Sequence, residues 1–119
     1  MNFEIINQNG TPVALLQEED QVINNVDDMV DLIGNADYQG ARCVIIHSGN
    51  VHPDFFILST RFAGEILQKV SNYRMKLGIV GDFSKHSSES LRDFIRESNR
   101  SGQVVFKGSV EEALEIFGG

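Results

Sequence analysis

The sequence predicts a single α/β domain over residues 1–119, with a five-stranded mixed sheet in the order ββαβαβαβα. Two short apolar runs separated by Asn9-Gly10 predict an N-terminal antiparallel hairpin, because a tight primed turn needs positive φ at both central residues. Beyond the hairpin, short apolar runs alternate with amphipathic segments, which is the pattern of parallel strands joined by helices. A chain of this length can bury a core of its own.

The first third of the chain supplies the hairpin and the first helix. Strands are predicted at 2–7 and 11–16, and a polar, acidic connection follows at 17–24. Asn25 is typical of a helix N-cap, because its side chain accepts a hydrogen bond from a free backbone N–H. The helix that it opens carries an apolar stripe at helical spacing, formed by Val26, Met29, Val30 and Ile33.

Three further strands are predicted at 42–47, 75–81 and 103–107, because each is a short apolar run suited to a buried parallel sheet. The first two are joined by the longest predicted helix, which starts at Pro53 because proline is favoured at the first helical position. Its apolar stripe consists of Phe55, Leu58, Phe62, Ile66, Val70 and Tyr73.

The last two helices have clear start signals. The loop at 82–88 is polar and ends in the capping residues Ser87 and Ser88. The helix beyond it buries Leu91, Phe94, Ile95 and Ser98. Ser109 followed by Glu112 has the spacing of a capping box, which opens a final helix. Its inward residues are Val110, Ala113, Leu114 and Phe117. Each strand–helix–strand connection should cross over right-handed, so these strands run parallel.

Acidic residues dominate the first third of the chain. Residues 1–41 contain eight acids and no Lys or Arg, whereas 42–119 contain all ten basic residues against nine acids. The net charge of −7 argues against nucleic-acid binding, which needs basic residues gathered on one face. The acidic face either docks a basic partner protein or is a solvated surface that keeps the protein soluble.

The sequence predicts a cytoplasmic protein that does not enter membranes. No stretch approaches the roughly 20 apolar residues that span a bilayer, and the start MNFEIINQNG lacks the positive charge of a secretory signal. The single cysteine, Cys43, cannot form an internal disulfide, which agrees with a reducing compartment. Within a strand, Cys43 is more typical of a buried apolar side chain than of a nucleophile.

The middle of the chain contains three long, distinctive strings: HPDFFILSTRFAGEILQK (52–69), NYRMKLGIVGDFS (72–84) and SLRDFIRESNR (90–100). These strings resemble a bacterial family known only as domain of unknown function 4180. The resemblance covers most of the chain and is weakest in the hairpin. It implies a bacterial origin and a fold, and it brings no established activity.

The order of elements also resembles the STAS domains of anti-sigma-factor antagonists. In those domains, a serine at the start of the helix after the strand matching 42–47 accepts phosphate. Here Phe55 and Phe56 occupy that place, and Ser59 and Thr60 follow about one helical turn later. The resemblance therefore implies a STAS-like fold and gives no phosphorylation site.

Polar side chains gather in the two loops that follow the strands at 42–47 and 75–81. Ligands tend to bind beyond the carboxyl ends of parallel strands, where such loops meet. The candidate ligand-binding residues are His47, Ser48, Asn50 and His52 after the first strand, and Asp82, Ser84 and His86 after the second. All three histidines of the protein lie in these loops.

Three kinds of chemistry are consistent with these residue types. Imidazole and carboxylate groups suit zinc or iron, but no HxH, HExxH or CxxC spacing is present, so no metal site is assigned. A histidine beside Asp82 suits acid–base chemistry, but no GxSxG elbow accompanies Ser48 or Ser84, so no catalytic residue is assigned. The third possibility is that these loops bind a small polar ligand or a segment of a partner protein.

We therefore predict a non-enzymatic binding or regulatory domain without a cofactor. It would engage an unknown small ligand or protein partner through 47–54 and 82–86 or through the acidic face. One alternative is a small enzyme centred on His47, Asp82 and His86. Another is self-association as a homodimer, with Phe55 or Phe56 in the seam. Each polar residue also has a local structural explanation, since Asp82 and Ser84 suit a turn that enters a helix.

Overall fold

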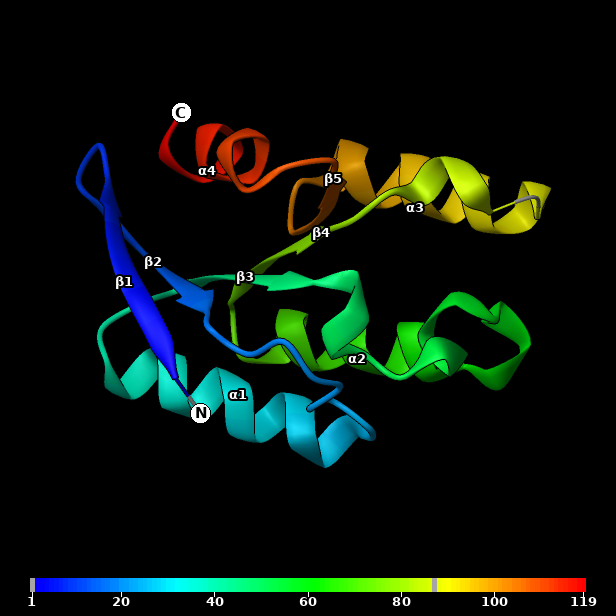
Figure 1. Ribbon diagram of the computed structural model, residues 1–119, viewed down its shortest axis with the longest axis horizontal. Coiled ribbons are helices and arrows are strands. Elements are labelled where there is room, and N and C mark those ends of the chain that lie inside the picture. The colour runs from blue at the N-terminus through cyan, green and yellow to red at the C-terminus, as the bar shows by residue number, and fades with distance from the viewer. Residues whose placement is uncertain (1, 87) are drawn as a thin grey trace.

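The computed structural model describes residues 2–86 and 88–119, and its elements follow the predicted order (Figure 1). Within these residues, five strands form one mixed sheet. They are β1 (Phe3–Gln8), β2 (Thr11–Leu16), β3 (Cys43–His47), β4 (Lys76–Val80) and β5 (Val104–Lys107). The strands lie in sequence order across the sheet; β1 runs antiparallel to β2, and the remaining neighbours are parallel. The predicted mixed sheet is therefore confirmed.

Four helices cover the sheet unequally in the described part of the chain. They are α1 (Val26–Tyr38), α2 (Phe62–Asn72), α3 (Glu89–Ser101) and α4 (Val110–Gly118). When parallel strands follow one another in sequence order with crossovers of one hand, the connecting helices fall on the same face. Accordingly, the inward apolar residues of α1, α2 and α3 join the core layer on one face of the sheet, whereas those of α4 form the layer on the other face.

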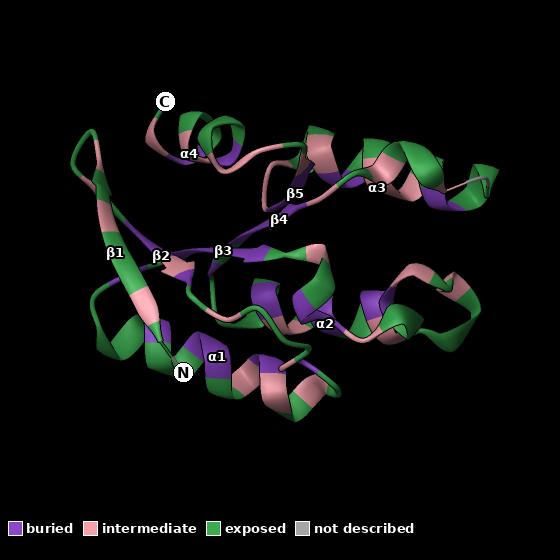
Figure 2. Ribbon diagram, viewed as in Figure 1, coloured by how far each residue is buried: buried purple, intermediate pink, exposed green. Residues whose placement is uncertain are grey.

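The core consists of two apolar layers, one on each face of the sheet. The larger layer lies between the sheet and α1, α2 and α3, and it contains the fully buried Phe55. The smaller layer lies under α4 and contains Ala113 and Phe117. Figure 2 shows buried residues along the strands and on the inward sides of the helices, with exposed residues on the outer surfaces.

Local signals in the sequence set the turn and the helix starts as predicted. Asn9 and Gly10 both have positive φ, at 54° and 91°, which a primed hairpin turn requires. Three N-cap side chains accept hydrogen bonds from the first turn of their helices at 2.8–3.2 Å: Asn25 from Asp28 N–H, Ser88 from Leu91 N–H and Ser109 from Glu112 N–H. Ser87, the other predicted capping residue, lies outside the described residues.

The prediction of one long helix starting at Pro53 is wrong. Residues 53–56 and 58–60 form two separate 3₁₀ turns, and α2 begins only at Phe62. The Thr60 hydroxyl donates to the carbonyl oxygens of Asp54 and Ile57, and Arg61 adopts a left-handed backbone with φ of 66°. These bonds satisfy the backbone without a continuous helix. The longest helices of the described chain are instead α1 and α3, each with 13 residues.

Candidate functional site

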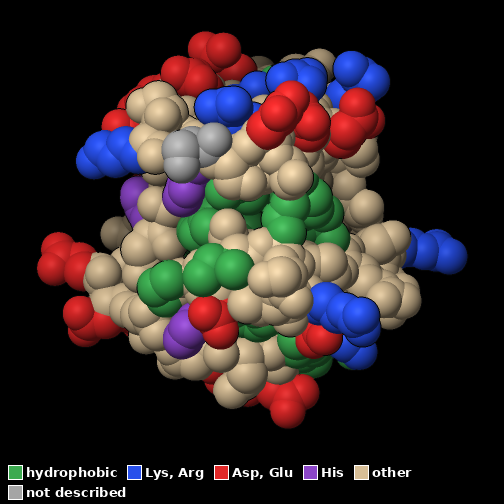
Figure 3. All heavy atoms as spheres, turned by 90° about the vertical axis from the view of Figure 1, so that its right-hand side faces the viewer, with side chains coloured by type: hydrophobic (Ala, Val, Ile, Leu, Met, Phe, Trp, Pro, Cys, Tyr) green, Lys and Arg blue, Asp and Glu red, His purple; other side chains and the backbone are tan. Residues whose placement is uncertain are grey.

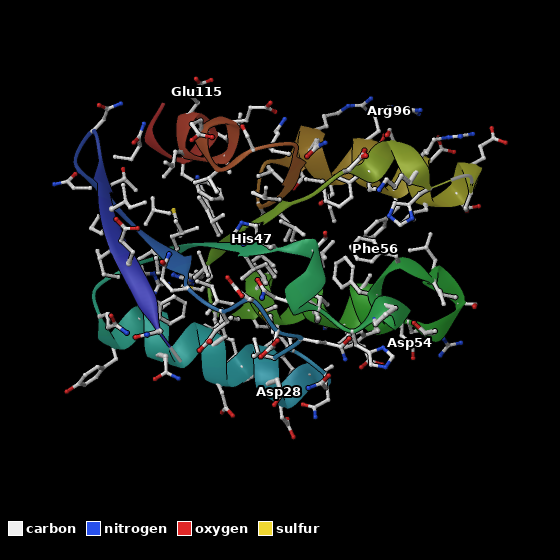
Figure 4. The ribbon with its side chains drawn as sticks, in the orientation of Figure 1. Asp28, His47, Asp54, Phe56, Arg96 and Glu115 are labelled. Carbon is white, nitrogen blue, oxygen red and sulfur yellow. The ribbon has the colours of Figure 1, made fainter. Side chains whose placement is uncertain are left out.

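The two loops predicted to meet at the carboxyl edge of the sheet do lie together. We define the β3 loop as residues 48–61 and the β4 loop as residues 81–88, of which residue 87 is not described. Gly81 lies so close to Ser48 that a Cβ atom on the glycine would be 2.9 Å from the Ser48 Cβ. Figure 4 shows Phe56 and Asp54 of the β3 loop at the end of the molecule opposite β1, with His47 nearer the centre.

Asn50 is buried and joins the β3 loop to the acidic connection that follows β2. Its side chain is 1% exposed and donates to the carbonyl oxygens of Glu18 and Asp20 at 2.9 and 3.0 Å. Its side-chain oxygen accepts from the His47 N–H at 2.8 Å. The side chain predicted to bind a ligand is thus engaged in holding two parts of the backbone together.

His47 ends β3 and lies exposed at an open hollow of about 450 Å³. The same hollow is lined by Glu18, Glu19 and Asn50. Because two acidic residues are among those that line it, this hollow favours a cationic group over an anion. Ser48, the next candidate, packs against Gly81 and so contributes to the contact between the loops.

His52 caps the 3₁₀ turn at 53–56 and lines a different hollow. Its Nδ1 accepts a hydrogen bond from the Asp54 N–H at 3.0 Å. The hollow beside it has a volume of about 260 Å³ and is shared with Asp54, Glu65 and the start of α1. His52 and His47 therefore face separate hollows.

Asp82 and Ser84 form a local turn in the β4 loop. One carboxylate oxygen of Asp82 accepts from the Ser84 hydroxyl at 2.5 Å and from the Ser84 N–H at 3.1 Å. The hydroxyl, followed by the N–H, lowers the pKa of the exposed Asp82 carboxyl below its usual range. Within the described residues, the hydrogen bonds of this carboxylate go to Ser84 and not to a histidine.

His86 lies in an aromatic stack that bridges the two loops. Its imidazole stacks on the Phe56 ring with centroids 5.0 Å apart at 17°, and it lies 6.3 Å from the Phe83 ring at 20°. All three side chains are partly exposed, and we call them the aromatic surface. Phe83 also packs edge-on against the buried Phe106 at 5.4 Å, which anchors this surface to the core.

The face that carries these loops is apolar in its middle and charged at its margins. Figure 3 shows hydrophobic side chains across the centre of the view, with Lys, Arg, Asp and Glu above and below them. Ile57, which follows Phe56, is 52% exposed. Phe55 is fully buried, so the prediction that it forms a dimer seam is wrong.

The sequence predicts a ligand-binding role for His86 but none for Phe56 and Phe83, the two rings that it contacts. Phe83 lies in the predicted loop between Asp82 and Ser84, but a phenylalanine does not match the polar residue types that indicate a ligand site. The sequence indicates a contact role for Phe56 through a dimer seam alone. The signal present in the sequence is the phenylalanine pair Phe55-Phe56 in the β3 loop together with Phe83 in the β4 loop.

The three histidines do not form one cluster. Among residues 2–86 and 88–119, no three His, Cys, Asp or Glu side chains lie close enough together to hold a metal ion. Cys43 is buried in β3, and burial raises the pKa of its thiol against the opposing effect of nearby Lys76. The thiol therefore behaves as a small apolar side chain, as the sequence predicted.

Among three comparisons with known proteins, the one with protein-family models gives a match to this chain. No curated protein and no solved structure matches it, so the STAS resemblance stays a prediction. In the described residues, no helix has both the length and the apolar character needed to cross a membrane. The family model described as "Domain of unknown function (DUF4180)" matches residues 8–116, which include every strand-end residue discussed above. The chain therefore belongs to the DUF4180 family.

Proposed function

We propose that this protein is a non-enzymatic protein-binding module and that its aromatic surface, formed by Phe56, Phe83 and His86, is the contact with the partner. The observation that carries the proposal is the stack of His86 on Phe56, which joins the loops of two neighbouring strands into one partly exposed apolar surface. Aromatic side chains are enriched at the cores of protein interfaces and dominate their binding energy.

The geometry of the polar residues favours binding over catalysis. A catalytic site needs a nucleophile or base whose reactive atom is directed at a shared substrate position. Here Asp82 is hydrogen-bonded to Ser84, His52 to the Asp54 N–H, and Asn50 to backbone groups. Each of these side chains stabilises a local turn or the framework, so these contacts do not assemble a reactive pair.

The shape and chemistry of the surface favour a protein partner over a small ligand. The hollows at His47 and His52 are lined by polar and acidic residues, whereas the aromatic surface lies between the loops with Ile57 exposed beside it. The partner that fits is a protein segment that presents a large apolar side chain to the rings of His86 and Phe56. Asp54 and Lys85, both exposed, would supply polar contacts at the margin.

The proposal includes a bacterial origin, a cytoplasmic location and a STAS-like fold. The residue strings that carry the family resemblance support the bacterial origin. The single cysteine, which is buried and free, supports the cytoplasmic location, and the order of elements supports the STAS-like fold.

A random-peptide display selection against the folded protein tests this function. We expect the selected peptides to share an aromatic or aliphatic anchor, and their NMR titration to shift resonances at 54–58 and 82–86. Ile57→Ser and His86→Ala should each weaken binding of a selected peptide by about tenfold, because both truncate the apolar contact.

Glu19→Gln provides the matched control, since it changes the His47 hollow and leaves the aromatic surface intact. Its peptide affinity should equal that of the wild type. The proposal is wrong if no peptide is selected above the background of an unrelated protein. It is equally wrong if the selected peptides shift Glu18, Glu19 and His47 and lose affinity in Glu19→Gln.

A further inference from the structure

The two edges of the sheet differ in how their outward backbone groups are satisfied. At the β5 edge, α3 lies alongside and provides side-chain partners. The Asn99 side-chain oxygen accepts from the Phe106 N–H at 2.7 Å, and the Ser98 hydroxyl donates to the Val104 carbonyl oxygen. These contacts block the β5 edge against pairing with another strand.

The outer edge of β1 has no such cover in the described structure. No strand lies beyond β1 in the sheet, and Figure 1 shows this strand as the outermost element on its side of the molecule. Natural edge strands are commonly protected by charged side chains, especially lysine, by proline or by a bulge. β1 reads FEIINQ and pairs with β2 in an unbroken register, so it has no lysine, proline or bulge, and its one charged side chain is Glu4.

The register of the hairpin identifies which backbone groups point outward. The Gln17 N–H donates to the Asn2 carbonyl oxygen at 2.7 Å, in phase with the pairs Glu4–Leu15 and Ile6–Val13. In an antiparallel ladder, alternate residues exchange hydrogen bonds with the neighbouring strand. The residues between them direct their N–H and C=O groups away from β2, and these are Phe3, Ile5 and Asn7.

We infer that β1 pairs antiparallel with β1 of a second copy of this chain, about a two-fold axis at Ile5. In this register Ile5 lies opposite Ile5 of the second copy, and Phe3 lies opposite Asn7. All three outward-facing residues of each copy then exchange hydrogen bonds across the axis. A two-fold contact of this kind uses the same surface on both copies, so the assembly stops at the dimer.

The side chains of β1 support a second copy as the occupant. Ile5 is 42% exposed on the single chain, and in this register it packs against its own counterpart. Glu4 falls opposite Ile6 of the second copy, so the two carboxylates do not face each other. The dimer is independent of the proposed function, because β1 and the loop that carries Phe56 lie at opposite ends of the molecule (Figure 4).

Sedimentation velocity over a concentration series, up to ~1 mM, tests the inference. We expect the wild type to dimerise and Ile5→Lys and Ile5→Glu each to sediment as folded monomers, because like charges then meet at the axis. An equimolar mixture of these two variants should dimerise again, because Lys then faces Glu. Circular dichroism verifies that each variant is folded, which the exposure of Ile5 leads us to expect.

Ile116→Lys is the matched control, since Ile116 is 46% exposed and lies on α4 rather than on the β1 edge. This variant should dimerise like the wild type. A wild type that stays monomeric at ~1 mM overturns the inference, and so does an Ile5→Lys variant that still dimerises. Failure of the mixture to restore the dimer overturns the register centred on Ile5.

Discussion

The loops that follow β3 and β4 carry similar polar residues but use them differently. In the β3 loop, Asn50 is 1% exposed and bonds backbone groups of Glu18 and Asp20, which lie 32 and 30 residues away. In the β4 loop, Asp82 is exposed and bonds Ser84, two residues away. A polar residue after a parallel strand can therefore join distant backbone segments, and so be part of the framework of the fold, or it can stabilise only its own turn.

The β3 loop is integrated into the fold over its first five residues. The Asn50 carbonyl oxygen accepts from the Val22 and Ile23 N–H groups, and the His52 N–H donates to the Ile23 carbonyl oxygen. Ile23 and Val51 also form an isolated parallel bridge. The β4 loop is held at Gly81, whose N–H donates to the Lys107 carbonyl oxygen and which packs against Ser48. Beyond Gly81, it contacts the rest of the structure through the rings of Phe83 and His86. Substitutions in the two loops should consequently differ most in their effect on stability.

Asn50→Ala should produce the largest effect. It leaves the carbonyl oxygens of Glu18 and Asp20 and the N–H of His47, all in part-buried hydrogen bonds, without their side-chain partner. Unsatisfied buried groups cost about 1–3 kcal/mol each, partly offset by water entry, so we expect a loss of about 2–4 kcal/mol in the free energy of unfolding. Urea denaturation followed by circular dichroism measures this loss.

Asn72→Ala is the matched control for that experiment. Asn72 is exposed at the end of α2, where alanine is well tolerated. Its free energy of unfolding should stay within about 0.5 kcal/mol of the wild type. Equal stabilities for Asn50→Ala and Asn72→Ala would show that the β3 loop is not part of the framework, and the contrast between the two loops would fail.

Sequence reasoning succeeds where a contact is short in sequence and is made by a residue type characteristic of it. Asn9-Gly10 forms its turn because the two residues themselves tolerate positive φ. Asn25 and Ser109 cap their helices through backbone groups three residues ahead. The meeting of the β3 and β4 loops was also predictable, because parallel neighbours end at the same edge of a sheet.

The break before α2 is made by short-range contacts that no residue type announces, whereas the roles of the loop residues depend on longer-range geometry. Apolar spacing continues through Phe55 and Phe62, and nothing in the residue type of Arg61 signals a left-handed backbone. The burial of Asn50 depends on backbone carbonyls in a connection thirty residues earlier. The stack of His86 on Phe56 likewise requires the exact packing of two loops, which hydrophobic periodicity does not encode.

Gly81→Ala should have an intermediate effect, because it disturbs the contact between the loops. The added Cβ would overlap the Ser48 hydroxyl and lie 2.9 Å from the Ser48 Cβ. Overpacking of this kind typically costs about 1–3 kcal/mol in the free energy of unfolding. Gly49→Ala, one residue from Ser48, meets nothing within 4 Å and should change the free energy of unfolding by less than about 0.5 kcal/mol.

A double-mutant cycle distinguishes a clash with Ser48 from a general effect of alanine at this position. Ser48→Gly removes the two closest atoms that the new Cβ meets and leaves Phe83 Cζ at 3.3 Å, although a more flexible backbone costs about 0.5–1 kcal/mol itself. Gly81→Ala combined with Ser48→Gly should therefore lose less stability than the sum of the single variants. Strict additivity would mean that the two loops are not in contact through these residues.

Ser84→Ala should have the smallest effect, confined to the β4 loop. The Ser84 hydroxyl is the main cause of the lowered pKa of Asp82, and its removal leaves the weaker effects of the backbone N–H, Lys85 and His86. We expect the pKa of the Asp82 carboxyl, measured by NMR titration, to rise toward the usual range of an aspartate. Ser59→Ala, an exposed serine in the β3 loop, should leave that pKa unchanged.

The sign of the accompanying pH dependence follows from the direction of the pKa shift. Because the pKa of Asp82 is lower in the folded than in the unfolded chain, its contribution to stability is present above the usual aspartate pKa and fades as the pH falls through the folded value. In Ser84→Ala, most of the loss in the free energy of unfolding on acidification that is due to Asp82 should disappear. Near neutral pH the free energy of unfolding should be almost unchanged, because the Asp82 carboxylate is exposed and its interactions are screened by solvent. A large loss at neutral pH would instead place Asp82 in the framework with Asn50, and the two loops would no longer differ.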